Sequence, residues 1–267
     1  MIRVIVTGAA GRMGCMILKA LNDAEGMVCA AAVEARRHPA LGRDAGEVAG
    51  IGPLGVPVTV GLETVLNRGD VVVDFTSAEA SVHHAALSAS AGTPMVIGST
   101  GFSADQRQAL RDHAVRIPMV VTPNMSAGVN LLFSLVGQVA RTLGKSYDIE
   151  IIELHHRLKK DAPSGTALRL GEVMADALGR AWEDTAVYAR HGVIGPRSHD
   201  EIGVQAVRAG DIVGDHTVLF AGMGERVEIT HRAHTRETFA HGAVRAAAWV
   251  VGRPSGLYDM QDVLGLK

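Results

Sequence analysis

The sequence predicts an α/β protein with a Rossmann-like parallel sheet domain and a smaller α+β domain built on a mixed sheet. Three observations support this. Short apolar runs alternate with helical patterns over residues 1–125, a glycine-rich turn follows the first run, and later strand-like runs lack helices between them. Continuous apolar strands separated by helices are typical of a parallel sheet covered on both faces, whereas strands without intervening helices indicate an antiparallel or mixed sheet.

The first 125 residues supply the elements of the parallel sheet. Apolar runs predict strands at residues 4–6, 27–33, 71–75, 95–98 and 119–122, and helical composition predicts helices at 16–21, 78–91 and 104–115. The segment 38–57 is rich in glycine and proline, which favours a loop followed by one short strand at 56–60.

The pattern changes near residue 126. A long apolar helix at 128–143 leads into a strand at 148–154 that alternates apolar and polar residues, and a helix follows at 167–178. Three more alternating strands are expected at 202–207, 215–220 and 226–231, and an alanine-rich helix at 239–251 is expected to pack back on the first domain.

Composition excludes several function classes. The formal net charge is −2 and aromatic residues make up 4% of the chain, so neither a basic field nor a stacking surface exists for nucleic acid. No apolar stretch reaches the length of a membrane span. The two cysteines form no Cys-x-x-Cys pair, so we expect neither a disulfide nor a cysteine metal site, and we expect the protein in the cytoplasm.

The glycine-rich turn predicts a dinucleotide site. Residues 8–14 read Gly-Ala-Ala-Gly-Arg-Met-Gly directly after the first strand and open a helix, so their backbone can approach a pyrophosphate. Glu34 lies 20 residues beyond Gly14, where an acid can accept hydrogen bonds from the adenosine ribose. Glu34 favours NAD, while Arg36 and Arg37 either admit NADP or are solvated loop charges. A βαβ unit without a ligand is the alternative.

Two further loops follow strands of the same sheet. Gly98-Ser99-Thr100-Gly101 comes after the fourth strand, and Thr122-Pro123-Asn124-Met125 comes after the fifth. Ligands of open α/β sheets lie at the carboxyl ends of the strands, so these loops are candidates to contact a nicotinamide ring and its amide. Each is also compatible with a plain turn.

A basic loop near the middle of the chain predicts the reactive site. Residues 155–160 hold five histidine, lysine or arginine side chains, and Pro163-Ser164-Gly165-Thr166 then precedes a helix. Free N–H groups at a helix start, beside the Ser164 and Thr166 hydroxyls, suit a carboxylate or phosphate. Nearby histidine and lysine side chains can donate protons. The alternatives are a solvated basic turn or, with less support, a metal site on the His155-His156 pair, which lacks a third ligand.

Together, these two segments resemble the 4-hydroxy-tetrahydrodipicolinate reductase family, also called dihydrodipicolinate reductase. The resemblance rests on Val6–Gly14 and on Glu153-Leu154-His155-His156-x-x-Lys159-x-Asp161-Ala162-Pro163-Ser164-Gly165-Thr166-Ala167, and it extends to residues 256–260. It implies NADH- or NADPH-dependent reduction of a cyclic dicarboxylate imine in lysine and diaminopimelate biosynthesis. It also implies a dinucleotide-binding domain at 1–125, completed by 237–267, and a domain at 126–236 that binds substrate and forms a homotetramer.

The resemblance also implies roles for individual residues. His155 becomes the proton donor or acceptor and Lys159 a proton donor, while His156, Gly165 and Thr166 hold the substrate's carboxylates, with Ser164 beside them. The positions that match cofactor contacts of the family are Gly8, Ala9, Ala10, Gly11, Arg12, Met13, Glu34, Gly98, Ser99, Thr100, Thr122, Pro123, Asn124 and Met125. One departure is Ala35, where well-known members have an arginine that contacts NADP; Arg36 is the candidate to replace it.

Two other functions compete with this interpretation. Another dehydrogenase on the same fold, acting on an amino acid or a semialdehyde, would share the cofactor site. A nucleotide-sensing module would bind NADH without oxidising it, and would not need an acid/base loop. A short-chain dehydrogenase is disfavoured because no tyrosine is followed four positions later by lysine.

Overall fold

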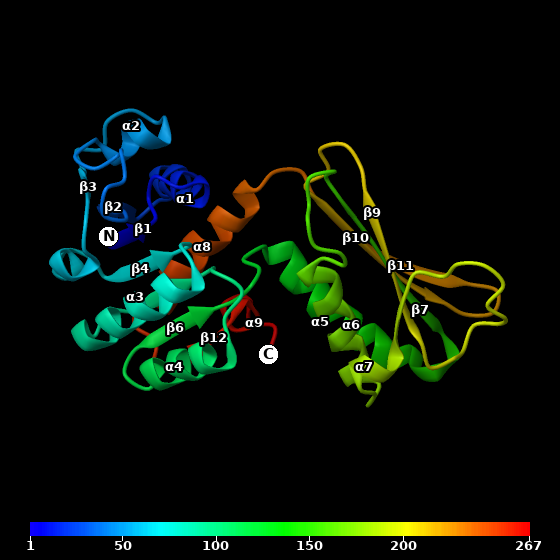
Figure 1. Ribbon diagram of the computed structural model, residues 1–267. Coiled ribbons are helices and arrows are strands. Elements are labelled where there is room, and N and C mark those ends of the chain that lie inside the picture. Colours follow the sequence, from blue (N-terminus) through cyan, green and yellow to red (C-terminus); the bar gives the residue numbers. More distant parts are fainter. The chain divides into compact units, whose positions relative to one another are not determined.

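The computed structural model describes all 267 residues and divides into two compact units (Figure 1). Unit 1 comprises Met1–Ala127 and Glu237–Lys267, and unit 2 comprises Gly128–Arg236.

Unit 1 is built on a seven-stranded sheet in which every pair of neighbouring strands is parallel. The strand order is β12-β6-β5-β4-β1-β2-β3. The strands are β1 (Ile2–Thr7), β2 (Met27–Val33), β3 (Val58–Thr59), β4 (Val71–Asp74), β5 (Met95–Ile97), β6 (Pro118–Val121) and β12 (Gly256–Tyr258). The chain runs outward from β1 in one direction through β2 and β3 and in the other through β4 to β6. The order therefore reverses between β1 and β4, which is where ligands bind in open sheets of this kind.

Helices cover both faces of this sheet (Figure 1). The helices of unit 1 are α1 (Arg12–Asn22), α2 (Ala45–Ala49), α3 (Ala78–Ala91), α4 (Ala104–Ala114), α8 (Glu237–Val250) and α9 (Met260–Leu264), with short 3₁₀ turns at Leu62–Thr64 and Leu66–Arg68. Val4 and Val6 of β1 pack in the core formed with α1 and α8, while Ile5 between them packs in the core formed with α3 and α4. A strand buried on both faces needs an unbroken apolar run, which explains the consecutive apolar residues in β1 and β4.

Two parts of unit 1 differ from the sequence-based expectation. The segment 38–57 is not only a loop, because Asp44 caps the short helix α2 by accepting hydrogen bonds from the backbone N–H groups of Gly46 and Glu47. The end of the chain adds a seventh strand, β12, which pairs with β6, and the short helix α9. None of these elements is longer than five residues, so no periodicity marks them in the sequence.

Unit 2 contains a mixed five-stranded sheet in the order β11-β10-β7-β9-β8. Its strands are β7 (Asp148–His155), β8 (Ala186–Tyr188), β9 (Ile202–Arg208), β10 (Gly214–Ala221) and β11 (Arg226–Ala233), and its helices are α5 (Ala127–Leu143), α6 (Gly165–Ala177) and α7 (Trp182–Thr185), with a 3₁₀ turn at Gly144–Ser146. β9 runs parallel to β7 and β8, whereas β10 runs antiparallel to β7 and β11. The expected mixed sheet is confirmed.

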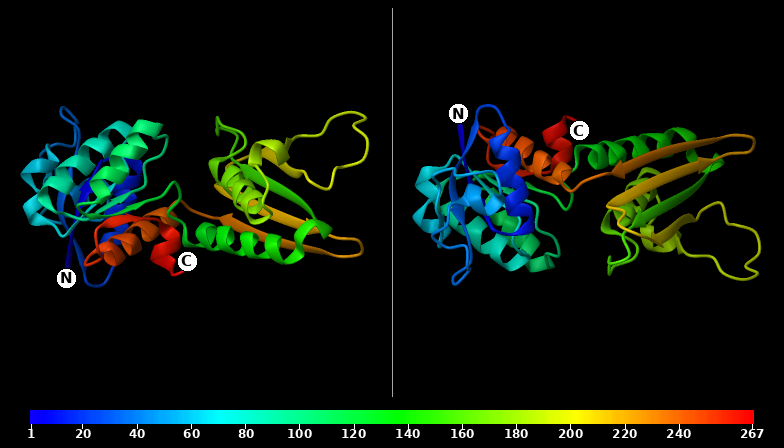
Figure 2. Two further views of the ribbon diagram at one scale, coloured as in Figure 1. Left: turned by 90° about the horizontal axis from the view of Figure 1, so that it is seen from below. Right: turned by 90° about the horizontal axis from the view of Figure 1, so that it is seen from above.

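One face of the unit 2 sheet packs against α5 and α6 (Figures 1 and 2). Burial alternates strictly along β7 and β10, and Ile151 and Val218 are fully buried on the helix-covered face. The side chains between them, such as Ile152 and Leu219, lie on the opposite face and are only partly buried. Near the end of β7 the helix-covered face becomes polar, because Glu153 and His155 take the positions that isoleucines occupy earlier in the strand.

Candidate active site

The glycine turn of unit 1 is shaped by close backbone contacts. Gly8 adopts φ +62°, a conformation that favours glycine. A Cβ atom at residue 14 would lie 2.1 Å from the carbonyl oxygen of Gly8, so the first turn of α1 packs directly on the loop. The N-cap of α1 is Gly11, whose lack of a side chain leaves the helix start without a side-chain cap. Such a helix start is the standard binding site for a phosphate group.

Glu34 joins the end of β2 to this turn. Its Oε1 accepts a hydrogen bond from the Ala10 N–H at 3.0 Å, and its Oε2 accepts one from the Ala35 N–H at 3.0 Å. The structure therefore brings together the glycine turn and the acidic residue that the sequence spacing singled out.

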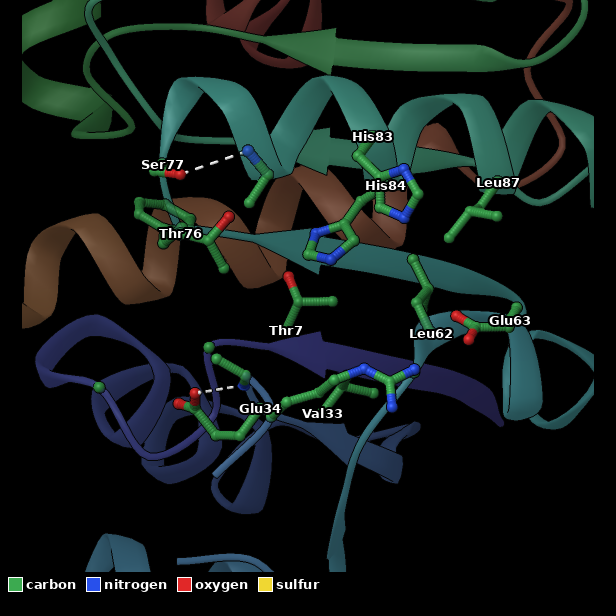
Figure 3. A pocket seen from close by; sticks show the side chains of 17 residues that line it. Thr7, Val33, Glu34, Leu62, Glu63, Thr76, Ser77, His83, His84 and Leu87 are labelled. Atoms are coloured by element: carbon green, nitrogen blue, oxygen red, sulfur yellow. Dashed lines mark hydrogen bonds between the residues drawn. The ribbon is translucent and has the colours of Figure 1, made fainter. Parts of the chain in front are cut away.

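A cavity of about 600 Å³ lies at the carboxyl ends of β1, β2 and β4. Gly8, Gly11, Glu34 and Arg36 line it, whereas Arg37 does not. Figure 3 shows Thr7, Glu34 and Thr76 around the same space as His83 and His84 of α3. The cavity occupies the point where the strand order reverses, so its position and its lining both fit the adenosine part of a dinucleotide.

A buried carboxylate that the sequence analysis missed organises this end of the sheet. Asp74, the last residue of β4, is fully buried, and its Oδ2 lies 2.6 Å from Nδ1 of His84. It also accepts hydrogen bonds from the hydroxyls of Thr7 at 2.8 Å and Ser81 at 2.6 Å. Burial raises the pKa of Asp74, but the hydrogen bonds from His84 and Ser81 outweigh it and lower the pKa overall. An aspartate that ends an apolar strand is the one signal that could have identified it.

The two later loops also lie at the carboxyl ends of strands. Gly98 packs against the ring of Phe75, where a Cβ atom would approach within 2.2 Å, and the hydroxyl oxygens of Ser81 and Ser99 lie 2.8 Å apart. Asn124 Oδ1 accepts a hydrogen bond from the Ser126 N–H at 2.9 Å. A second cavity in unit 1, of about 370 Å³, is lined by residues of both loops, Ser99, Thr100, Thr122 and Pro123 among them.

The remaining predicted cofactor positions differ in exposure. The side chains of Ala9 and Met125 are buried in the core, so they can contact a ligand only through their backbone. Ala10 and Met13 are partly buried, and Arg12 is exposed at the start of α1.

In unit 2, the basic loop is organised around Glu153. This side chain has no exposed surface, and its Oε2 lies 2.5 Å from Nδ1 of His155. Arg208, at the end of β9, donates to both carboxylate oxygens at 2.8 Å, and the Ser164 N–H donates to Oε1 at 3.0 Å. Burial raises the pKa of Glu153, but these hydrogen bonds outweigh it and hold the pKa at about 2. The carboxylate is therefore ionised at neutral pH.

A second buried histidine packs against the first. His216 of β10 has its ring centroid 5.2 Å from that of His155, and its Nε2 lies 3.0 Å from Ser164 Oγ. Burial and the nearby His155 lower the pKa of His216 to about 3, so its imidazole is neutral at physiological pH. Sequence reasoning missed Arg208 and His216 because they lie on other strands and only the sheet register brings them to this loop.

The start of α6 completes the site in unit 2. Ser164 is its N-cap and accepts a hydrogen bond from the Ala167 N–H at 3.2 Å, so the serine hydroxyl is engaged by the cap and by His216. Gly165 and Thr166 are the first two residues of the helix. Lys159 and His156 lie on the same loop: Lys159 Nζ is 2.9 Å from Asp161 Oδ1, and His156 Nε2 is 3.5 Å from an Arg236 nitrogen.

Each predicted group of site residues is thus assembled within its own unit. The glycine turn, Glu34 and the two later loops belong to unit 1, and the residues at 155–166 belong to unit 2. No group of three or more histidine, cysteine, aspartate or glutamate side chains is arranged to hold a metal ion. No helix has the length and apolar character needed to cross a membrane.

Comparison with known proteins finds one family over nearly the whole chain. Residues 2–125 match the family described as dihydrodipicolinate reductase, N-terminus, and residues 128–264 match dihydrodipicolinate reductase, C-terminus. The chain is 57% identical to a 4-hydroxy-tetrahydrodipicolinate reductase of Anaeromyxobacter dehalogenans (strain 2CP-1 / ATCC BAA-258), covering 100% of this chain and 99% of the relative. It is 54% identical to the protein of the same name from Syntrophus aciditrophicus (strain SB), over 100% of both chains.

Solved structures agree with this. A dipicolinate-bound dihydrodipicolinate reductase from Paenisporosarcina sp. TG-14 superposes with a TM-score of 0.79 at 26% identity, covering 98% of each chain. An aspartate semialdehyde dehydrogenase II from Vibrio cholerae, at a TM-score of 0.58 and 12% identity over 94% of this chain and 98% of that one, shares the fold alone.

Proposed function

The chain belongs to the dihydrodipicolinate reductase family, and we propose that it reduces 4-hydroxy-tetrahydrodipicolinate to tetrahydrodipicolinate in lysine and diaminopimelate biosynthesis. It is an oxidoreductase that uses a pyridine nucleotide. The observation that carries the substrate assignment is the arrangement of residues 153–166. A buried, ionised Glu153 contacts both His155 and the Ser164 N–H at the start of α6, and it thereby places an acid next to a carboxylate site.

The residues of unit 1 fit a dinucleotide. A cavity lined by Gly8, Gly11 and Glu34 lies where such cofactors bind, and the contact between Gly14 and the Gly8 carbonyl leaves no room for a side chain. We assign the pyrophosphate to residues 8–13, the adenosine ribose to Glu34, and the nicotinamide to the loops at 98–100 and 122–125. When bound, the reduced nicotinamide supplies a hydride to the conjugated imine ring of the substrate.

The residues of unit 2 supply the proton and hold the substrate. The 4-hydroxyl leaves as water together with a proton from the adjacent ring carbon, which leaves a conjugated imine. Hydride addition to that ring then creates negative charge that takes up one proton, so the net reaction consumes one hydride and one proton and releases one water. We assign proton donation to His155 and Lys159, because a protonated imidazole and an ammonium on the same loop can both protonate the reduced ring. His156 and the N–H groups of Gly165 and Thr166 bind the two carboxylates, with Ser164 fixing the helix start.

Both NADH and NADPH are proposed cofactors. Glu34 suits the ribose hydroxyls of NADH, and its carboxylate is held by two backbone N–H groups. Arg36 lines the same cavity. It is therefore the candidate to bind a 2′-phosphate, because position 35, where well-known family members have an arginine, is an alanine in this chain.

A homotetramer is the proposed assembly. Supporting it, the face of the unit 2 sheet away from the helices carries apolar side chains that are not fully buried, including the partly buried Ile152 and Leu219 and Val207, which is 40% exposed. We place the protein in the cytoplasm, because both cysteines are free thiols. Sedimentation at micromolar concentration tests the assembly.

The proposed reaction is tested with the purified protein, each reduced cofactor and freshly generated cyclic imine. Loss of nicotinamide absorbance that depends on the cyclic imine is the expected result. Aspartate semialdehyde and free amino acids, with oxidised cofactor where the reaction requires it, serve as controls. Turnover of a control substrate without turnover of the cyclic imine would instead favour another dehydrogenase on this fold. NADH binding without any turnover would favour a sensing module.

A further inference from the structure

We propose that Glu153, clamped by Arg208, is a positioning residue that fixes the protonation geometry of His155 and at the same time anchors the start of α6. The inference rests on the proposed function, since it concerns the same site. It adds two residues, Glu153 and Arg208, to the machinery of that site, and both lie outside the residues that contact substrate in the proposal above.

The hydrogen-bond pattern determines which nitrogen of His155 carries its proton. An ionised carboxylate can only accept hydrogen bonds, so the short contact from Glu153 Oε2 to Nδ1, at 2.5 Å, requires a proton on Nδ1. The second ring nitrogen, Nε2, points away from Glu153 and lies beside Gly214, where a Cβ atom would come within 3.0 Å. His155 can therefore lose and regain a proton only at Nε2, and glycine at 214 keeps space beside that atom.

The same carboxylate holds the proposed carboxylate site in place. Glu153 Oε1 accepts the Ser164 N–H at 3.0 Å, and Ser164 is the N-cap of α6. One side chain thus ties the proton donor and the helix start to a common point. A shift of either relative to the other would require breaking a buried, charge-assisted hydrogen bond.

Arg208 makes this arrangement possible. A carboxylate without exposed surface needs compensating charge, and Arg208 provides two hydrogen bonds of 2.8 Å to it. Arg208 is itself held by the Asp161 carbonyl oxygen at 2.7 Å, so it links the end of β9 to the loop after β7. The sheet register places Arg208 opposite His155, which explains why a residue 55 positions from Glu153 can reach it.

The proton cycle balances without a further partner. His155, protonated on both nitrogens, transfers the Nε2 proton to the reduced substrate ring and becomes neutral, keeping the Nδ1 proton on the Glu153 contact. Solvent then returns a proton to Nε2. The charge of Glu153 favours the doubly protonated form and that of Arg208 opposes it. The other titratable or charged groups around this pair are His216 from β10, His231 from β11, and Lys159 and Asp161 from the loop after β7.

Substitution of the two residues is expected to move the pH profile in opposite directions. Glu153→Gln removes the negative charge, so the alkaline limb of the kcat profile moves to lower pH by roughly one unit, and kcat at neutral pH falls on the order of 10²-fold. Arg208→Gln removes the positive charge, so the same limb moves to higher pH. A general loss of packing in unit 2 would not shift the alkaline limb in opposite directions in the two variants.

The chain offers a matched control. Glu150 lies on the same strand and is also clamped by an arginine, Arg190, with contacts of 2.8 and 3.0 Å, but it lies on the opposite face of the sheet from His155. Glu150→Gln is expected to lower the thermal stability of unit 2 without displacing the pH profile.

A second readout does not depend on turnover. In ¹⁵N-detected NMR at a pH where His155 is neutral, the parent is expected to show the proton of His155 on Nδ1, with His155→Ala identifying the signal. Glu153→Gln is expected to place it on Nε2, because the amide N–H₂ group can donate to Nδ1. If the parent turns over substrate but Glu153→Gln leaves both the tautomer and the pH profile unchanged, the positioning role is wrong and the proposed function stands. If the parent does not turn over the cyclic imine, the proposed function fails independently of the tautomer.

Discussion

Replacing Gly14 with alanine is expected to weaken cofactor binding through a backbone clash. The added Cβ would lie 2.1 Å from the Gly8 carbonyl oxygen and 2.7 Å from the carbonyl carbon of Ala9. Neither atom belongs to a flexible side chain, so α1 or the glycine turn must move by on the order of 1 Å to restore van der Waals contact. The turn carries the N–H groups assigned to the pyrophosphate, and its displacement therefore acts directly on the cofactor.

The size of the effect follows from the cost of overpacking. Inserting a methyl group into a closely packed site costs roughly 1–3 kcal/mol. If that cost must be met to reach the binding conformation, the dissociation constant for NADH rises about 5- to 150-fold. Alanine also favours the helix over glycine by about 1 kcal/mol, which offsets part of the loss in stability but does not remove the clash.

The assay is a calorimetric titration of NADH into the parent, Gly14→Ala and a control variant, Gly137→Ala. Gly137 lies in α5 of unit 2, where the added Cβ would meet side-chain atoms only, of Val173 at 3.2 Å and of Arg141 at 3.7 Å. Because both substitutions replace a helical glycine, the change in helix propensity is shared. We expect the control to bind NADH like the parent. If Gly14→Ala unfolds cooperatively and also binds NADH as tightly as the parent, the assignment of the pyrophosphate to this turn is refuted.

Three further results are expected. Arg36→Ala should raise the dissociation constant for NADPH about tenfold or more and leave that for NADH within about twofold, because only the 2′-phosphate loses a charge-assisted contact; equal effects on both cofactors in the same titration would contradict this role. The pKa of Glu153 is about 2 in the folded protein and about 4.5 in the unfolded chain, so its ionised form should stabilise the fold by about 3 kcal/mol above pH 4.5, and this stability should be lost as the pH falls toward 2. Urea unfolding of the parent and of Glu153→Gln should show that the difference in their free energies of unfolding shrinks over that pH range. Asp74→Asn should lower the free energy of unfolding by roughly 1–3 kcal/mol, because the amide cannot accept all the hydrogen bonds that now reach the carboxylate; an unchanged urea midpoint would show that these contacts are dispensable.

Local patterns in the sequence predicted the elements that are long or repetitive. Most strands of both sheets follow from apolar runs and from alternation, whereas β8 and β12 do not. The glycine spacing singled out the turn and Glu34, which the structure joins through the Ala10 N–H. These features depend on neighbours along the chain or on a recurring supersecondary unit, so periodicity and spacing are enough to find them.

Residues that act through the sheet register could not be predicted in this way. Arg208 and His216 meet Glu153 only because β9 and β10 flank β7, and nothing near them in the sequence marks them as site residues. The pairing of Asp74 with His84 is similar, since it needs α3 to return across the end of β4. The short elements α2 and β12 were not predicted, because α2 forms through a helix cap and β12 through pairing at the sheet edge. Neither produces a periodic pattern of apolar residues in the sequence.

The central claim is that unit 1 binds the nucleotide and that the loop at 153–166 supplies the proton. Single-turnover oxidation of bound NADH by the cyclic imine, measured together with the NADH dissociation constant in the parent, His155→Ala and Lys159→Ala, tests it most directly. We expect each variant to bind NADH within about twofold of the parent and to oxidise it on the order of 10² times more slowly. Oxidation at the parental rate by both variants would contradict the claim.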